Sequence, residues 1–395
     1  MNSNQRKWYV IPRDAVLFTT ICIYILYMMW FQYAFFEIGG ILTVLGCMTL
    51  MLSIFERQSI ASYSLMYPLL GFGLYLILIS LFNNYSMSYA ITIIKYLVPV
   101  FGIYTYARKS QIHFDRIARL IFLSGILLAI SLIRNGHLTA EGALKLNNMN
   151  TNLTSNFLSL ALTMGLLLID INRKIKVNTL EILGCMVLCY GQIICASRRG
   201  FIITLFLVVA YVFILLGTVY KRKHSIKILV AIGIICILAY VFINYESLFQ
   251  SFSIFQRLSG INTTGDLGRM RYQKTAVDLF LDNFIIGKGL GAVEQVAGYY
   301  SHSFYLELLG CTGIIGFIII IGLMFSLLSK LNYIRKQAKY DNSMDRVFYT
   351  SYMIAFVLSI LVSGIAMVYI YESYFYIMLA MVMSYLSINN DSNQN

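Results

Sequence analysis

The chain has 395 residues, of which 59% are hydrophobic and only 12% are charged. Charged residues normally make up about a quarter of a globular chain, so this composition excludes an ordinary soluble domain. The net charge of +13 would suggest a nucleic-acid ligand in a soluble protein. In a chain of apolar segments, basic residues instead gather in cytoplasmic loops, so we expect no nucleic-acid partner.

Apolar runs of about 17 to 25 residues are long enough to cross a bilayer as helices. The sequence predicts about twelve such spans, at residues 15–35, 39–55, 65–82, 88–106, 117–133, 153–170, 179–196, 201–219, 226–243, 303–328, 347–367 and 373–388. The expected fold class is therefore an all-α, polytopic integral membrane protein, with residues 1–395 forming a single membrane domain. The first run is long enough to span, so we expect no cleavable signal peptide.

Basic residues occur mainly in alternate loops, with clusters at residues 6–13, 108–119, 173–176, 221–227 and 330–346. By the positive-inside rule this bias predicts that both termini are cytoplasmic. The opposite, extracytoplasmic side then carries a long loop at residues 244–302, and loops of that length are uncommon unless they are functional or disordered.

The long loop contains a helical pattern and a glycine-rich stretch. Arg271, Lys274 and Asp278 recur at three- and four-residue steps, while Tyr272 and Ala276 fill the opposite face. This pattern predicts an amphipathic helix along the membrane interface, with its apolar side on lipid or protein. The stretch Gly287-Lys288-Gly289-Leu290-Gly291 lacks the P-loop pattern and a preceding strand, so it predicts a tight turn.

Two basic groups fall on the expected outer side. Ser197-Arg198-Arg199-Gly200 connects two apolar runs, and its guanidinium groups either reach lipid phosphates or face inward and bind a phosphate or pyrophosphate. The long loop adds Arg257, Arg269, Arg271 and Lys274, which form either a solvated charged face or a site for an anionic ligand. A lipid-linked diphosphate is the obvious anion at that surface.

His302 stands at the start of the next apolar run. A neutral imidazole can accept a proton from a hydroxyl group, although a single histidine is more often a hydrogen-bonded surface residue. Glu37, in the first outer turn, is the carboxylate that could compete for the role of base. The sequence has no Asp-x-Asp pair, and its seven cysteines lack zinc-type spacing, so we expect no metal and no cofactor.

Three motifs together resemble the O-antigen ligase and polymerase superfamily, which includes Wzy-type polysaccharide polymerases. Ser197-Arg198-Arg199-Gly200 is similar to the family's Ser-Arg-Gly turn, and Gly268-Arg269-Met270-Arg271-Tyr272 is similar to its Gly-Arg block. Ser301-His302-Ser303-Phe304-Tyr305-Leu306, with Gly313 and Gly316, resembles a His-Asn-x-Tyr-Leu run that ends in Gly-x-x-Gly. The chain departs from the family where Ser303 replaces the usual Asn and Cys311 stands at a position that is often Glu.

The resemblance implies a metal-independent glycosyltransferase that uses an undecaprenyl-diphosphate-linked glycan at the outer face of the bacterial inner membrane. It implies that His302 is the general base and that Arg199 and Arg269 neutralise the leaving diphosphate. Further contacts with the substrate are expected from Arg198, Arg257, Arg271, Lys274 and Tyr305.

The main interpretation is a polymerase of capsular or O-antigen repeat units that acts beside a flippase and a chain-length regulator. A ligase of the same fold is the second interpretation. A lipid-linked oligosaccharide flippase or transporter comes third, because only Lys95 lies well inside a span and no internal repeat is found.

Overall fold

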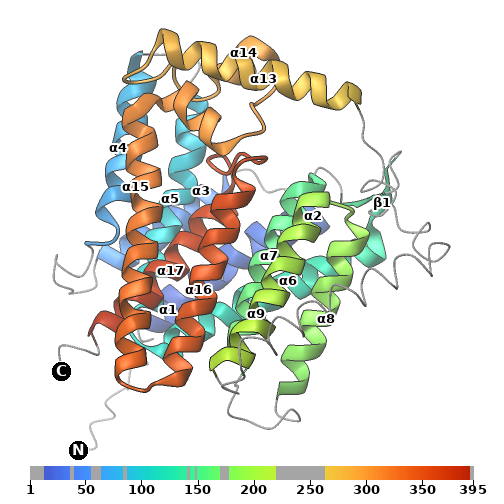
Figure 1. The fold of residues 1–395 in the computed structure, drawn as a ribbon, viewed down its shortest axis with the longest axis vertical. Helices are drawn as coiled ribbons and strands as arrows, with labels where there is room; N and C mark the ends of the chain where they lie inside the picture. Colours follow the sequence, from blue (N-terminus) through green and yellow to red (C-terminus); the bar gives the residue numbers. More distant parts are fainter. Residues whose placement is uncertain are drawn as a thin grey trace, which may run out of the picture.

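The computed structural model describes residues 13–35, 40–54, 64–82, 87–139, 143–146, 149–169, 178–218 and 263–391. Within these ranges the protein is a bundle of long helices, and two further helices, α13 and α14, lie across one end of it (Figure 1). Among the described secondary-structure elements, the only ones that are not helical are a pair of two-residue strands. The all-α prediction is confirmed.

The elements follow one another in a simple order, and their bounds are these. The helices are α1 (Arg13–Leu26), the π-helical turn η1 (Tyr27–Phe31), α2 (Gln32–Ala34), α3 (Ile41–Ile54), α4 (Tyr67–Phe82), α5 (Met87–Ala107), α6 (Gln111–Asn135), α7 (Thr151–Leu168), α8 (Thr179–Ile194), α9 (Arg198–Thr218), α13 (Thr263–Asp282), α14 (Ala292–Ala297), α15 (Phe304–Tyr340), α16 (Met344–Ser363) and α17 (Ser373–Asp391). The strands β1 (His137–Leu138) and β2 (Leu144–Lys145) pair antiparallel between α6 and α7.

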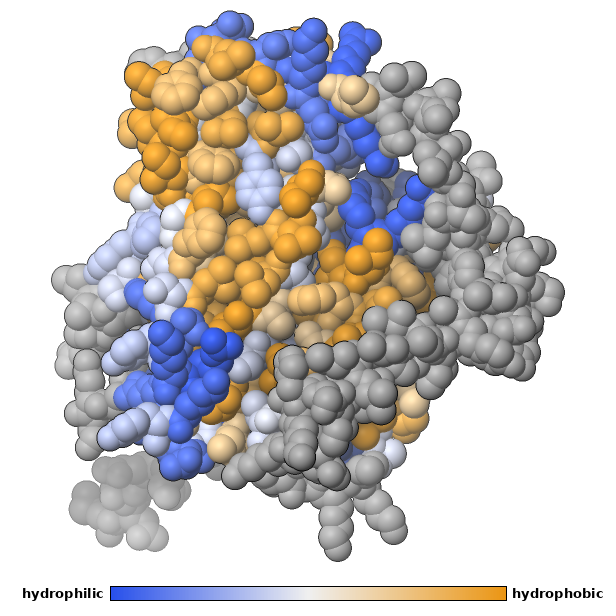
Figure 2. Space-filling view, viewed as in Figure 1, coloured by the Kyte–Doolittle hydropathy of each residue, from blue (hydrophilic) through white to orange (hydrophobic). Residues whose placement is uncertain are grey.

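Seven of the described helices are long and apolar enough to cross a membrane, and four shorter apolar helices accompany them. Each of these helices overlaps one predicted span, so the polytopic membrane fold is confirmed. The predicted span at residues 226–243 lies outside the described residues, and the total of twelve stays a prediction. Figure 2 shows a broad hydrophobic surface over the middle of the bundle, with hydrophilic side chains gathered at its lower end and along part of its upper edge.

Several helices extend beyond their predicted ends. The span predicted at 303–328 is α15, which continues to Tyr340, and the span predicted at 117–133 is α6, which begins at Gln111. These extensions are polar and include Lys330 and Arg335. Hydropathy detects only the apolar part of a helix, whereas backbone hydrogen bonds carry the helix on into polar surroundings.

The long helix α15 is broken near its beginning. Gly313 has φ 61° and ψ −168°, which is not a helical conformation. The turn that follows α13 bonds to the backbone at this break: Lys288 N–H donates to the Gly310 carbonyl at 3.0 Å, and Ile314 N–H donates to the Phe284 carbonyl at 2.9 Å. Backbone groups released by a break in a membrane helix require such partners from the protein.

Glycines permit this backbone-to-backbone contact. A Cβ atom on Gly287, whose φ is +72°, would lie 2.4 Å from the nitrogen of Gly313. A Cβ atom on Gly313 would lie 2.4 Å from the carbonyl oxygen of Ile285. No side chain fits at either position, and the positive φ angles also favour glycine. The prediction of a tight turn in this stretch is confirmed, and the turn fastens the end of α13 to α15.

The amphipathic helix predicted in the long loop is α13. Ala276 is fully buried, whereas Arg271, Lys274 and Asp278 are exposed. The buried face packs on α15, where a Cβ atom on Gly310 would lie 2.8 Å from the carbonyl oxygen of Ala276. The apolar side of α13 therefore rests on protein, and its position along a membrane interface stays a prediction.

Candidate active site

The Ser197–Gly200 motif begins α9 and is held by a strained turn. Ala196, just before it, is buried and has φ 52°, a left-handed conformation that is uncommon outside glycine. The Ser197 hydroxyl donates to Asn152 Oδ1 at 2.9 Å and accepts a bond from Gly200 N–H at 3.4 Å, as an N-cap residue does. Both arginines consequently lie in the first turn of α9, where Arg198 is exposed and Arg199 is half-buried.

A buried polar network holds α7, α8 and α9 together at the level of these arginines. Gln192 of α8 is fully buried, and its Nε2 donates to the Ser155 carbonyl at 2.7 Å and to Ser159 Oγ at 2.8 Å on α7. A Cβ atom on Gly200 would lie only 1.2 Å from Ser155 Oγ. Because no larger residue fits there, Gly200 allows α9 to approach α7. This close approach fixes the position of the Arg199 backbone.

His302 lies in a second strained turn, immediately before α15. Its φ is 58°, and Ser303 caps the helix by accepting a bond from Leu306 N–H at 3.5 Å. Glu307, one turn into α15, is fully buried. One oxygen of its carboxylate accepts from Ser301 N–H at 2.8 Å, and the other accepts from the Tyr371 hydroxyl at 3.1 Å. These bonds hold the turn in a conformation that costs about 1–3 kcal/mol.

Three tyrosine rings surround the imidazole. The ring of Tyr299 stacks on His302 with centroids 5.1 Å apart, and the ring of Tyr300 lies 4.7 Å away. Tyr272 of α13 lies 6.0 Å from the same imidazole. Nδ1 of His302 is buried and has no hydrogen-bond partner among the described residues. A buried polar atom without a partner is costly, so this nitrogen has a hydrogen-bonding capacity that the described residues leave unused.

Burial and the positive charges around His302 keep it neutral. Burial lowers the pKa of His302, and the positive charges of Arg269 and Arg199 lower it further, to about 4. Both effects have the same sign, because burial and nearby cations each disfavour the imidazolium form. At neutral pH the imidazole is therefore able to accept a proton. Arg199 of α9 also interacts with Arg269 of α13 and with Tyr300, so side chains from separate parts of the chain converge here.

The structure thus brings together Arg199, Arg269 and His302, the three residues predicted to carry the chemistry. The expected auxiliary residues are placed differently. Arg271 and Lys274 are exposed on the side of α13 opposite Ala276, and the Tyr305 hydroxyl donates to the Leu361 carbonyl of α16. Arg198 is exposed next to Arg199, and both Arg257 and Glu37 lie outside the described residues.

Sequence reasoning did not single out Glu307 and Tyr299. A carboxylate within an apolar run is unusual in a membrane helix, and that signal marks Glu307. Cys311, which stands where the family resemblance often has Glu, has its Sγ 3.6 Å from Oε1 of Glu307. The two residues lie one helical turn apart on the same face of α15.

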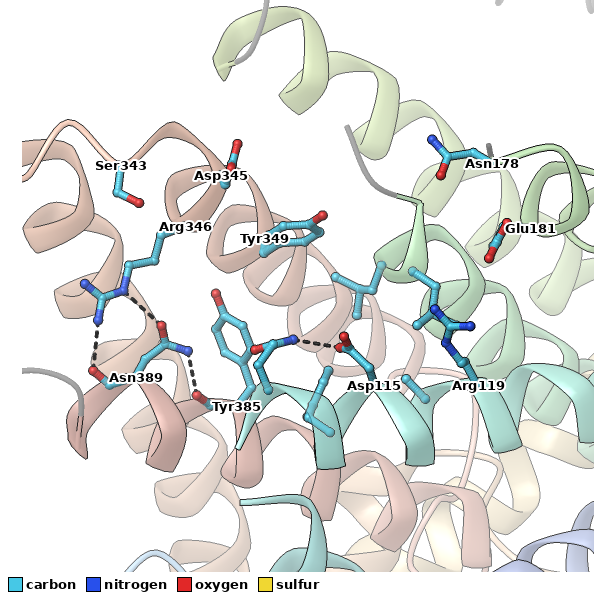
Figure 3. A pocket seen from close by; sticks show the side chains of 15 residues that line it. Asp115, Arg119, Asn178, Glu181, Ser343, Asp345, Arg346, Tyr349, Tyr385 and Asn389 are labelled. Carbon is cyan, nitrogen blue, oxygen red and sulfur yellow. Dashed lines mark hydrogen bonds between the residues drawn. The ribbon is translucent and has the colours of Figure 1, made fainter. Parts of the chain in front are cut away.

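A cavity of about 460 Å³ lies at the opposite end of the bundle (Figure 3). It is lined by the first turns of α6, α8 and α16 and by the last turns of α7 and α17. Some of its polar groups bond to one another: Arg346 Nε donates to Asn389 Oδ1 at 2.9 Å, and Gln111 donates to Asp115. It contains no residue predicted for the active site, so we do not assign the chemistry to it.

Comparisons with known proteins agree with the resemblance. Residues 183–321 match the family model described as O-antigen ligase, a range that includes Arg199, Arg269 and His302. The match supports the resemblance of this chain to the O-antigen ligase and polymerase superfamily, and this prediction is confirmed. No curated protein sequence matches the chain.

Among solved structures, the chain resembles one chain of a peptidoglycan synthase complex whose study concerns polymerization and crosslinking. The TM-score is 0.51, with 14% identity over 84% of this chain and 98% of that chain. At this identity the likeness shows a common fold alone.

Proposed function

We propose that this protein transfers glycan units from an undecaprenyl-diphosphate-linked donor to a sugar hydroxyl at the outer face of the bacterial inner membrane. Repeated transfer of oligosaccharide repeat units would build a capsular or O-antigen polysaccharide. The observation that supports this reaction is the convergence of Arg199, Arg269 and the unpartnered Nδ1 of His302. The match of residues 183–321 to the O-antigen ligase family supports the same class of chemistry.

In the proposed step His302 accepts the proton of the acceptor hydroxyl. The acceptor oxygen forms a bond to the anomeric carbon of the donor glycan, and the bond between that carbon and the phosphate oxygen breaks. The electron pair of the broken bond leaves with undecaprenyl diphosphate. His302 then releases its proton to water, which returns the site to its starting state.

Arg199 and Arg269 stabilise the charge that develops on the leaving diphosphate. A guanidinium group presents two parallel donors to a phosphate, and such charge-assisted bonds are about twice as strong as neutral ones. The bound diphosphate also offsets the two positive charges that depress the pKa of His302. The imidazole thereby becomes a stronger base when the donor is in place, closer to the pKa at which general bases work best.

The second candidate is a ligase that transfers a finished glycan to a different acceptor. The description of the matching family as O-antigen ligase favours this alternative. Both reactions use the same donor, base and leaving group, so the site geometry serves either. The identity of the acceptor separates them.

Reconstitution tests the proposal. The purified protein is placed in lipid vesicles with the lipid-linked oligosaccharide that accumulates in cells lacking it, and the products are separated by size. A polymerase should convert this lipid alone into a ladder of products spaced by one repeat unit. A ligase should form new product only when a second acceptor lipid is added. The absence of any transfer under both conditions would contradict the proposed function.

The pKa of His302 predicts a pH profile. Because the base must be unprotonated, kcat/KM for the donor should stay level as pH falls toward about 5 and should be lost as pH falls through about 4. Replacing Arg269 by Gln removes one of the cations that lower the pKa of His302. The acid limb of the variant should therefore shift to higher pH, toward the ordinary histidine value.

The control for this profile is Arg134→Gln, because Arg134 is also an exposed arginine but lies at the end of α6. Its acid limb should coincide with that of the wild type. An acid limb at the same pH in Arg269→Gln would show that Arg269 does not act on the essential base.

A further inference from the structure

Glu372 lies next to this site and has no role in the reaction proposed above. It stands in the turn before α17, where its N–H donates to the Tyr369 carbonyl at 2.9 Å. The preceding residue, Tyr371, donates to Glu307 and accepts a bond from Gly291 N–H at 3.0 Å. The bond from Tyr371 to Glu307 thus joins the turn that contains Glu372 to the His302 turn.

The carboxylate of Glu372 is half-buried, and within the described residues it takes part in no hydrogen bond or ion pair. Burial raises its pKa to about 7. Near neutral pH this group can therefore accept a hydrogen bond as a carboxylate or donate one as a carboxylic acid. A partly buried carboxyl group without a partner is unfavourable. Its unused hydrogen-bonding capacity is therefore available to a polar ligand.

Tyr300 interacts electrostatically with both Glu372 and Arg199. Burial has the largest effect and raises the pKa of Tyr300, and the negative charge of Glu372 raises it further, whereas the positive charge of Arg199 acts against both. The site therefore combines positive charge, from Arg199 and Arg269, with negative charge, from Glu372. A diphosphate is attracted to the two arginines and repelled by the Glu372 carboxylate. A neutral polyol is suited to binding at Glu372, because its hydroxyls donate to a carboxylate.

Tyr299 adds an open aromatic surface on the same turn. Its side chain is 39% exposed, and its ring lies 4.3 Å from that of Tyr300 and 5.1 Å from the imidazole of His302. The face of an aromatic ring is electronegative, and the C–H groups on one face of a pyranose are weakly positive. A sugar ring can accordingly pack on Tyr299 while its hydroxyls point toward charged groups at the edge.

From this arrangement we infer that Glu372 and Tyr299 form the binding subsite for the acceptor sugar. The inference rests on the proposed glycosyl transfer and extends it to the second substrate. An in-line displacement at the anomeric carbon places the acceptor and the leaving diphosphate on opposite sides of that carbon. Attraction of the diphosphate to Arg199 and Arg269 and its repulsion by Glu372 favour that order, with His302 beside the acceptor hydroxyl.

The test measures the two substrates separately. The probe acceptor is the water-soluble oligosaccharide that mild acid releases from the accumulating lipid, and the donor is the intact lipid. Glu372→Gln should raise KM for the soluble acceptor by about 10- to 100-fold, the loss expected for a hydrogen bond to a charged group. KM for the donor and kcat should change by less than about threefold. Tyr299→Leu should also raise acceptor KM, whereas Tyr299→Phe, which keeps the ring, should restore it.

The outcomes separate this inference from the proposed function. Arg199→Gln in the same assay should raise donor KM and leave acceptor KM nearly unchanged. This result verifies that the assay distinguishes effects on the donor from effects on the acceptor. If it does so while Glu372→Gln leaves acceptor KM at the wild-type value, the acceptor subsite is wrong and the glycosyl transfer stands. If Glu372→Gln loses kcat at constant acceptor KM, Glu372 is a proton acceptor and the subsite is again wrong. If the wild-type protein forms no product, both proposals fail.

Discussion

Replacing His302 by Ala should abolish glycan longer than one repeat unit while the protein remains folded in the membrane. General-base catalysis contributes about 10²- to 10⁴-fold to rate, and no other described residue offers a neutral, unpartnered imidazole beside Arg199 and Arg269. His302→Gln should be equally inactive, because an amide fills part of the same space but does not accept a proton. Product size is measured both in cells and in the reconstituted assay.

The variant needs a folding control, since His302 lies at a positive φ. His113→Ala provides a matched substitution, because His113 lies in the first turn of α6, where it contacts Ser110. This variant should retain normal product length, and both variants should keep the thermal unfolding midpoint of the wild type within a few degrees. A normal chain-length distribution in a folded His302→Ala protein would remove the histidine from the role of base.

The membrane fold was predictable because lipid imposes length and apolarity on every span. What hydropathy could not give was the end of each helix. The extension of α15 to Tyr340 is polar and was interpreted as a loop, and the arginine pair proved to belong to the first turn of α9. Charge alone does not end a helix, and the hydrogen bonds that do so depend on neighbours such as Asn152.

The candidate site was predictable only where short motifs carry it. Arg199, Arg269 and His302 stand in three separate stretches, and the motifs marked all of them. Glu307 and Glu372 are different, because their surroundings are made by tertiary contacts. The bond from Tyr371 to Glu307 joins the turn before α17 to α15, and no spacing in the sequence reveals it.

The break in α15 shows the same limit. The Gly-x-x-Gly spacing drew attention to Gly313 and Gly316, but the pattern alone is compatible with an unbroken helix. The break becomes understandable only when the turn after α13 is in place, because that turn bonds to the backbone groups that the break releases. The position of α13, and with it that of Arg269 relative to His302, depends on this contact.

Arg199→Lys should lower the rate of glycosyl transfer by about 10²- to 10³-fold, the loss typical when one donor to a developing anion is removed. Lysine keeps the positive charge but presents a point charge in place of a planar fork, so it does not reproduce two parallel bonds to a phosphate. Gly200 packs the first turn of α9 closely against α7 and so fixes the backbone position of residue 199. The helix therefore cannot shift to compensate for the different position of the lysine ammonium group.

The measurement is kcat and donor KM in the reconstituted assay, with Arg134→Lys as the matched control. Arg134 is an exposed arginine at the end of α6, so its replacement should leave both constants unchanged. If Arg199 only reached lipid phosphates, lysine would serve as well, because both side chains extend a charge past an apolar stem. Full activity of Arg199→Lys would therefore support that alternative. A loss confined to this variant would support a guanidinium that faces Tyr300 and Arg269 and binds the leaving diphosphate.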